Sequence, residues 1–275
     1  MSDIISVAAI NDMSGSGRCS LTAAMPILGA FGLQCCALPT AILSNHTGYD
    51  KYFFDDYTDK MERFIEDWKA YDMHFGCIYT GFLGSEKQID IAEKFFSTFR
   101  EENTKVLVDP VMGDDGKIYS TYTYELCEKM KRLISHADVV TPNVTEASIL
   151  SGIGYSGDSI SAETARAMAE AICTLGTQNV VITGIKRDGK AINYIYSPNG
   201  EHEYCSPIVP VYYSGTGDVF ASIVCGFLAK GKHIHDGVEF ATKFIEKAAK
   251  YSYEQGLTYL EGICFEKFIK EICLL

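Results

Sequence analysis

Residues 214–218, SGTGD, combine the residue types that a phosphoryl transfer requires. Gly215, Thr216 and Gly217 stand just before an apolar helical pattern, so their backbone N–H groups would lie at a helix start, where anions bind. Asp218 follows directly and offers a carboxylate that could accept the proton of an attacking hydroxyl. The alternative is a simple helix start, because an acidic residue in the first turn is mildly stabilising. The anion-binding N–H groups and the adjacent carboxylate together favour phosphoryl transfer to an alcohol.

Two further motifs could organise a metal ion and phosphates. In VLVDP, Asp109 ends an apolar run, and a carboxylate at that place could hold Mg²⁺ directly or through water. In TPNVTE, Asn143 and Glu146 are three residues apart, so both would lie on one helical face and could point at metal-bound phosphate. The same two residues also suit a helix start, where they would only cap the helix. Asp109 and Glu146 are the candidate metal ligands.

The turn at 11–18, NDMSGSGR, joins an expected strand to an expected helix. Its glycines fit the start of a dinucleotide-binding fingerprint, but Ser20 takes the place of the third small residue. The acidic residue expected about 20 positions later is also absent. We therefore expect either a tight turn or a polar ligand contact made by Asn11, Asp12 or Ser14.

A second polar turn, SNHTGY at 44–49, follows another apolar run. Its side chains carry hydroxyl, amide and imidazole groups, which can donate and accept hydrogen bonds around a small heteroaromatic ring. The residues concerned are Ser44, Asn45, His46 and Thr47. An ordinary exposed turn is the alternative.

These motifs are positioned by elements that alternate along the chain. Short apolar runs predict strands over 4–10, 33–43, 75–81, 105–110, 138–142 and 179–184. Longer amphipathic segments predict helices over 20–31, 58–72, 86–101, 122–136, 143–151 and 162–175. Such alternation predicts an α/β fold with a largely parallel sheet and crossover helices. Ligands bind beyond the carboxyl ends of such strands, where the motifs fall.

The later part of the chain has a different pattern. KAINYIYS and EHEYCSPIV, separated by PNG at 198–200, predict a β-hairpin, and the chain from Thr216 onward is mostly helical. No Pro/Ser-rich linker, low-complexity run or internal repeat interrupts the sequence. We therefore expect a single domain over residues 1–275.

Composition excludes several classes of partner. The net charge is −12 and no Lys/Arg block occurs, which argues against nucleic acid or a membrane surface as partner. The ten cysteines form no C-x-x-C pair, so we expect core thiols in a reducing compartment. The first residues do not resemble a signal peptide, and no apolar run reaches the ~20 residues of a membrane span. These features predict a cytoplasmic protein.

The motifs also resemble those of a known family. GTGD at the opening of a late helix resembles the ribokinase superfamily of small-molecule kinases, and DPVMGDDG with TPNVTE is similar to its vitamin-kinase branch. SNHTGY is similar to the pyridoxal kinase motif. The resemblance extends from Val7 to about Gly231. It implies a ribokinase-like α/β domain with helices on both faces of the sheet and a small β flap.

For the phosphate side of the site, the resemblance implies defined roles. Asp218 would activate the 5′-hydroxymethyl group of a pyridine, and the amides of residues 215–218 would form the anion hole for the γ-phosphate of ATP. The other contacts to ATP and Mg²⁺ would come from Asp109, Asn143, Glu146 and Thr183, with Tyr213 and Ser214 beside adenine. Members of the family need a divalent cation and often a monovalent one, which implies Mg²⁺ and K⁺. Many are homodimers.

For the ring side, the resemblance places His46 and Thr47 along the pyridine and Phe82 on or beside it. Together with the polar turns, the candidate contacts to the ring are Asp12, Ser14, Ser44, His46, Thr47 and Phe82. The implied activity is ATP-dependent phosphorylation of pyridoxal, pyridoxine or pyridoxamine.

Departures from the pyridoxal kinase pattern keep alternatives open. NDMSGSGR looks more like the first turn of hydroxymethylpyrimidine kinases, and Phe82 replaces a more common tyrosine. Against those kinases, SNHTGY is present, and Asp218 stands where they have a characteristic cysteine. The alternatives are a hydroxymethylpyrimidine kinase, a non-catalytic sensor of B6 or nucleotide and, more remotely, an NAD-dependent oxidoreductase.

Overall fold

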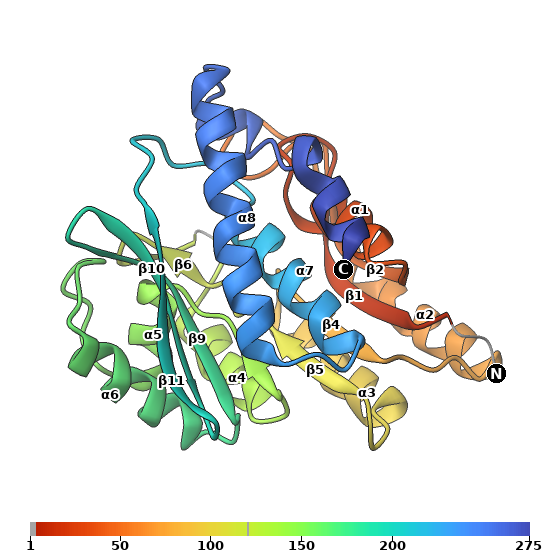
Figure 1. Ribbon diagram of the computed structural model, residues 1–275. Coiled ribbons are helices and arrows are strands. Elements are labelled where there is room, and N and C mark those ends of the chain that lie inside the picture. Colours follow the sequence, from red (N-terminus) through yellow and green to blue (C-terminus); the bar gives the residue numbers. More distant parts are fainter. Residues whose placement is uncertain (1–3, 120) are drawn as a thin grey trace.

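One nine-stranded sheet runs through the described part of the chain, residues 4–119 and 121–275, in the computed structural model (Figure 1). Its central strands pair in parallel: β1 (Ser6–Ser14), β2 (Gln34–Leu43), β4 (Cys77–Thr80), β5 (Lys105–Val108), β8 (Val139–Val140) and β9 (Asn179–Arg187). Antiparallel strands form the edges: β3 (Phe54–Asp56), β10 (Lys190–Ser197) and β11 (Gly200–Pro207). The order is β11-β10-β9-β8-β5-β4-β1-β2-β3, which confirms the largely parallel sheet.

Helices cover both faces of this sheet, as predicted (Figure 1). One layer consists of α1 (Ser20–Ala30), α7 (Thr216–Ala229) and α8 (Ile234–Glu254). The other consists of α2 (Thr58–Ala70), α3 (Glu86–Phe99), α4 (Tyr124–Ile134), α5 (Val144–Ser151) and α6 (Ala162–Cys173). Among the described residues, no helix is both long and apolar enough to cross a membrane.

Alternate residues of the central strands supply the two cores. In β1, Ala8 and Ile10 belong to the core under α2–α6, whereas Val7 and Ala9 belong to the core under α1, α7 and α8. All four are fully buried. This burial on both faces explains why the strands are continuous apolar runs without polar alternation, which is the pattern that identified them in the sequence.

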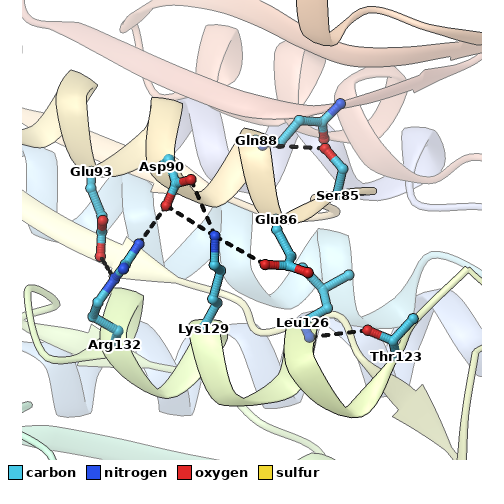
Figure 2. A network of polar contacts seen from close by, with 9 residues as sticks. All are labelled: Ser85, Glu86, Gln88, Asp90, Glu93, Thr123, Leu126, Lys129 and Arg132. Carbon is cyan, nitrogen blue, oxygen red and sulfur yellow. Dashed lines mark hydrogen bonds and ion pairs between the residues drawn. The ribbon is translucent and has the colours of Figure 1, made fainter.

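Charged side chains connect α3 to α4 on the outside of one layer (Figure 2). Lys129 of α4 pairs with Glu86 at 3.0 Å and with Asp90 at 3.2 Å, and Arg132 pairs with Glu93 at 2.6 Å. Both helices begin at a hydroxyl cap, because Ser85 accepts from the N–H of Gln88 and Thr123 accepts from that of Leu126. Exposed ion pairs of this kind contribute at most about 1 kcal/mol each to folding stability. The helix layer is therefore held on the sheet mainly by buried apolar packing.

The predicted strands, helices and hairpin are all present, with shifted ends. The hairpin turns at Pro198 and Asn199, between the paired residues Ser197 and Gly200. The ten cysteines, all within the described residues, are free thiols.

The predicted and observed secondary structures differ mainly in short elements. The predicted β flap is the two-stranded sheet of β6 (Gly113–Asp114) and β7 (Lys117–Ile118). Its turn residues Asp115 and Gly116 have φ of +48° and +75°, the conformation of a tight hairpin that Asp-Gly favours. Strand β3 was not predicted. The segment after α8, expected to be helical, forms two 3₁₀ helices, η1 (Tyr259–Glu261) and η2 (Glu266–Leu274).

Candidate active site

A cavity of about 860 Å³ lies at the carboxyl ends of the parallel strands. Every predicted site residue except Ser44 lines it: Asp12, Ser14, His46, Thr47, Phe82, Asp109, Asn143, Glu146, Thr183, Tyr213, Ser214, Gly215, Thr216, Gly217 and Asp218. These residues come from turns spread over more than 200 positions of the chain, and the parallel topology brings them to one edge.

Ser44 is exposed and serves its own turn. Its hydroxyl accepts a hydrogen bond from the N–H of Phe53 at 2.9 Å and donates to Asn45 Oδ1 at 2.8 Å. These bonds fasten the turn to the chain entering β3. The geometry therefore gives no support to the predicted contact between Ser44 and a substrate.

The turn before α7 has the geometry of an anion cradle. Gly215 precedes the helix with φ +81°, and a Cβ there would lie 2.1 Å from the carbonyl oxygen of Arg18, so only glycine fits. Gly217 is exposed to the cavity, and a Cβ at this position would stand 4.0 Å from Asp109 Oδ2. The N–H groups of a first helical turn have no acceptor within the helix, so they are available to an anion.

Asp218 stands in the first turn of α7, partly buried beside this cradle. Burial raises its pKa to about 6, and the charge of Asp12 acts in the same direction. Hydrogen bonds from the backbone at Ser20 and from Asn11 oppose the rise. The carboxylate is therefore ionised at neutral pH, and its pKa is close enough to the working pH for a general base.

Asp109 and Glu146 form an acidic pair without a basic neighbour. Asp109 Oδ1 accepts from Thr141 Oγ1 at 2.9 Å, and burial, together with the charge of Asp218, raises the pKa of Asp109 to about 7. Burial and the charge of Asp109 also raise the pKa of Glu146 well above its usual value. Two buried carboxylates with raised pKa values have the chemistry of a site for a divalent cation.

Few basic side chains in the cavity could neutralise the carboxylates of Asp109 and Glu146. Among the described residues that line it, Lys186 is the only lysine or arginine, and its ammonium group is paired with Asp158 at 2.9 Å. No group of three or more His, Cys, Asp or Glu side chains in the described part of the chain could hold a metal alone. Asp109 and Glu146 therefore fit a cation such as Mg²⁺ that takes its other ligands from phosphates and water.

The capping role of Asn143 and Glu146, left open by the sequence, is real. Asn143 Oδ1 accepts from the N–H of Glu146 at 2.9 Å, and Glu146 Oε2 accepts from the N–H of Asn143 at 2.8 Å. Glu146 Oε1 accepts from the N–H of Met112, and Asn143 Nδ2 donates to the carbonyl of Gly113 in the flap. The two side chains thus tie the start of α5 to the flap, and each carboxylate oxygen retains a lone pair.

The ring side of the cavity is lined by Asp12, Ser14, His46, Thr47 and Phe82. Ser14 Oγ donates to Asp12 Oδ2 at 2.8 Å, and burial raises the pKa of Asp12. His46 accepts from the N–H of Gly48 through Nδ1 and meets the carbonyl of Leu260 through Nε2 at 3.1 Å. These partners assign the proton to Nε2 and occupy both ring nitrogens, so His46 supports the turn.

Thr183, Tyr213 and Ser214 line another part of the cavity. The Tyr213 side chain is 1% exposed and belongs to the apolar core, and its hydroxyl has no partner. Side chains that the sequence did not single out complete this part: Asn193, Pro207, Val209, Val211, Thr242, Ile245 and Ala249. A largely apolar surface with a few polar groups suits a flat heteroaromatic base.

The sequence also missed the C-terminal segment 259–263, which closes the ring side and which we call the C-terminal strap. The carbonyl of Leu260 accepts from His46 and from the hydroxyl of Tyr49 at 3.0 Å. Ile263 N–H donates to the carbonyl of Ser214 at 3.1 Å. Tyr259 lines the cavity and stacks on Tyr212, with ring centroids 5.7 Å apart. No periodicity or motif in the sequence marked this segment.

Residues 21–261 match the family profile described as phosphomethylpyrimidine kinase. The chain belongs to the phosphomethylpyrimidine kinase family. A candidate member from Bacteroides thetaiotaomicron, crystallised in a form with pyridoxal, is 36% identical with a TM-score of 0.93, covering 98% of this chain and 96% of that chain. The pyridoxal kinase of Leishmania donovani, in complex with ADP and pyridoxine, is 25% identical with a TM-score of 0.87, covering 97% and 95%.

Curated relatives give the same family. The pyridoxal kinase PdxY of Actinobacillus pleuropneumoniae is 26% identical over 287 residues, which covers 98% of this chain and 96% of the relative. Membership of the phosphomethylpyrimidine and pyridoxal kinase family confirms the ribokinase-like fold. It makes the chain an ATP-binding phosphotransferase with an alcohol group as acceptor.

Proposed function

We propose that this kinase phosphorylates the 5′-hydroxymethyl group of pyridoxal, pyridoxine or pyridoxamine with ATP. The observation that carries the proposal is Asp218, which stands beside the bare N–H groups of residues 215–217 at one wall of the cavity. The relatives support the choice of acceptor, because one was crystallised with pyridoxal and another with ADP and pyridoxine.

The residues assign a role to each part of the transfer. The acceptor hydroxyl gives its proton to Asp218 as its oxygen attacks the γ-phosphorus; the new O–P bond forms while the bond to the β-phosphate oxygen breaks, and ADP leaves. The N–H groups at the start of α7 stabilise the charge on the transferred group. Mg²⁺, when bound, offsets the charge of the ATP phosphates, and Asp109 and Glu146 would hold it.

The two ends of the cavity fit the two substrates. Phe82 and Tyr259 present rings and Asp12, Ser14 and Thr47 present polar groups to the vitamer, whereas the apolar end bordered by 207–211 and α8 receives adenine. Thr183 and Ser214 line the same cavity, and their hydroxyls would contact the phosphates. K⁺ is proposed from the family resemblance alone.

Hydroxymethylpyrimidine is the second candidate acceptor. The matching family profile carries that activity in its description, and the 11–18 turn resembles that of such kinases. Both acceptors are six-membered heteroaromatic rings with a hydroxymethyl group, so the same base and cradle serve either one. The ring-side residues decide between them.

Turnover measurements separate the candidates. Purified protein with Mg-ATP is given pyridoxal, pyridoxine, pyridoxamine or hydroxymethylpyrimidine, and ADP release is followed. We expect turnover with at least one B6 vitamer, at a higher kcat/KM than with the pyrimidine. Turnover with the pyrimidine alone would overturn the proposal, and binding without any turnover would favour a sensor.

Asp218→Asn provides the mechanistic control. The amide preserves size but cannot accept the hydroxyl proton, so kcat should fall by about 10²–10⁴-fold with ATP affinity nearly unchanged. Near-normal turnover of this variant would show that Asp218 is not the base.

A further inference from the structure

Asn11 is a fully buried side chain next to the proposed base, and the proposed mechanism gives it no role. It belongs to β1, and its Oδ1 accepts two backbone hydrogen bonds, from Asp12 N at 2.9 Å and Phe82 N at 2.8 Å. Because the oxygen is fixed by two donors, the amide has one orientation. Its Nδ2 then donates to Asp218 Oδ1 at 3.1 Å.

The surroundings leave this amide no freedom to move. A Cβ at Gly81 would lie 2.3 Å from Asn11 Nδ2, so the side chain packs directly on the backbone after β4. The hydroxyl of the fully buried Tyr79 lies 3.5 Å from the same nitrogen. Asn11 is therefore a rigid donor held by β1 and by the end of β4.

A carboxylate turns easily about its last side-chain bond unless a partner fixes it. Asn11 donates to Oδ1 of Asp218, and the backbone at Ser20 also bonds to this carboxylate, so Asn11 is the side-chain donor among the groups that fix its orientation. The same amide binds the backbone of Phe82, which lines the ring side of the cavity. One side chain thus connects the base on α7 with the segment that contacts the ring.

We propose that Asn11 is a positioning residue, which aims Asp218 at the acceptor hydroxyl and fixes the base relative to the bound ring. The inference rests on the proposed function, in which Asp218 is the base. The hydrogen bond from Asn11 also favours the ionised carboxylate and so opposes the effect of burial. Loss of this donor should raise the pKa of Asp218 further.

Asn11→Ala tests the proposal by kinetics. We expect kcat to fall by about 10-fold to 100-fold, less than the loss of the base itself, with KM for ATP nearly unchanged. The acidic limb of the pH profile should move to higher pH.

Asn179→Ala is the matched control. Asn179 begins β9, at the amino end of the strand and so away from the cavity at the carboxyl ends, and its Nδ2 donates to the carbonyl of Asp138 at 2.8 Å. This variant also loses an asparagine hydrogen bond, but its pH profile should match that of the wild type. If Asn11→Ala lowers only the melting temperature and leaves the pH profile in place, Asn11 is structural and the proposal is wrong.

Direct titration of Asp218 separates this inference from the proposed function. Carboxyl ¹³C NMR, with Asp218→Asn for assignment, reports the pKa of Asp218 without any substrate. A higher pKa in Asn11→Ala supports the positioning contact even if the wild type fails to turn over a vitamer. An unchanged pKa overturns the inference even if the wild type is an active B6 kinase.

Discussion

To act as the proposed base, Asp218 has to be ionised, yet burial raises its pKa. Burial and the nearby charge of Asp12 raise its pKa, and the charge of Asp218 in turn raises the pKa of Asp109. Asn11 and the backbone at Ser20 partly compensate. The sequence predicted the base but not this balance, because the charges meet only when the ends of β1, β5 and α7 come together.

The pH profile of turnover should show this balance. With a pKa of about 6, Asp218 becomes protonated as the pH falls, so kcat/KM should decrease about tenfold per pH unit below 6. The measurement is kcat/KM for ATP at saturating pyridoxine between pH 5 and 8, with circular dichroism to verify that the protein stays folded. A flat profile down to pH 5 would contradict this assignment.

Asp109→Asn should stabilise the ligand-free protein. The pKa of Asp109 in the folded chain, about 7, exceeds the ordinary value of 3.8, so the folded state binds the proton more tightly. The free energy of unfolding therefore falls as the pH rises from about 4 to about 7. The Asp109→Asn side chain cannot ionise and therefore does not incur this cost. The free energy of unfolding at pH 7.5 should rise by on the order of 2 kcal/mol.

The same substitution should weaken the use of Mg²⁺. We expect a higher melting temperature without ligand and a higher Mg²⁺ concentration for half-maximal turnover. Thermal unfolding at pH 5 and pH 7.5 tests the first effect, since the difference between variant and wild type should be less than half as large at the lower pH. A destabilised variant at pH 7.5 would show that the Asp109 carboxylate is satisfied in the folded chain.

At the scale of elements, the sequence predicted what periodicity and turn chemistry encode. Buried strands, amphipathic helices and the hairpin all follow from local patterns, whereas the flap was expected only from the family resemblance. The C-terminal strap could not be predicted this way, because its bonds to His46 and Tyr49 join residues 214 and 211 positions apart. Such contacts depend on the tertiary fold and leave no periodic signal.

Gly262→Ala tests whether the C-terminal strap shapes the ring side. Gly262 has φ +73°, and a Cβ there would lie 2.0 Å from the carbonyl oxygen of Gly17, so the segment must shift. A shift of Leu260 and Tyr259 would loosen His46, and KM for the vitamer should rise by about 10-fold to 100-fold while KM for ATP changes little.

Gly256→Ala is the control for this experiment. Gly256 also has a positive φ, +71°, but nothing lies within 4 Å of its added Cβ, so it tests a positive-φ substitution without the collision. Both variants should lose some stability, and only Gly262→Ala should lose affinity for the vitamer. Equal effects on the vitamer KM would show that the strap has no part in the ring site.

At the scale of the whole molecule, the β3 edge of the sheet exposes aromatic side chains. Tyr52, Phe53 and Phe54 are 39%, 65% and 38% exposed, and β3 is the last strand in the order. An edge strand with successive exposed aromatic side chains is a typical contact surface between chains. We propose that this edge forms the homodimer expected from the family resemblance, next to the SNHTGY turn.

Light scattering and one charge substitution test this proposal. The wild type should have the mass of a dimer at micromolar concentration, and Phe53→Glu should shift it to the monomer, because burying an unpaired carboxylate in an apolar interface is costly. Tyr71→Glu is the control, since Tyr71 is 84% exposed at the end of α2 and away from β3. A monomeric wild type would refute the dimer. A dimer equally stable in Phe53→Glu and Tyr71→Glu would place the interface elsewhere. The Ser44 turn, which is hydrogen-bonded to Phe53, would then face solvent in the dimer.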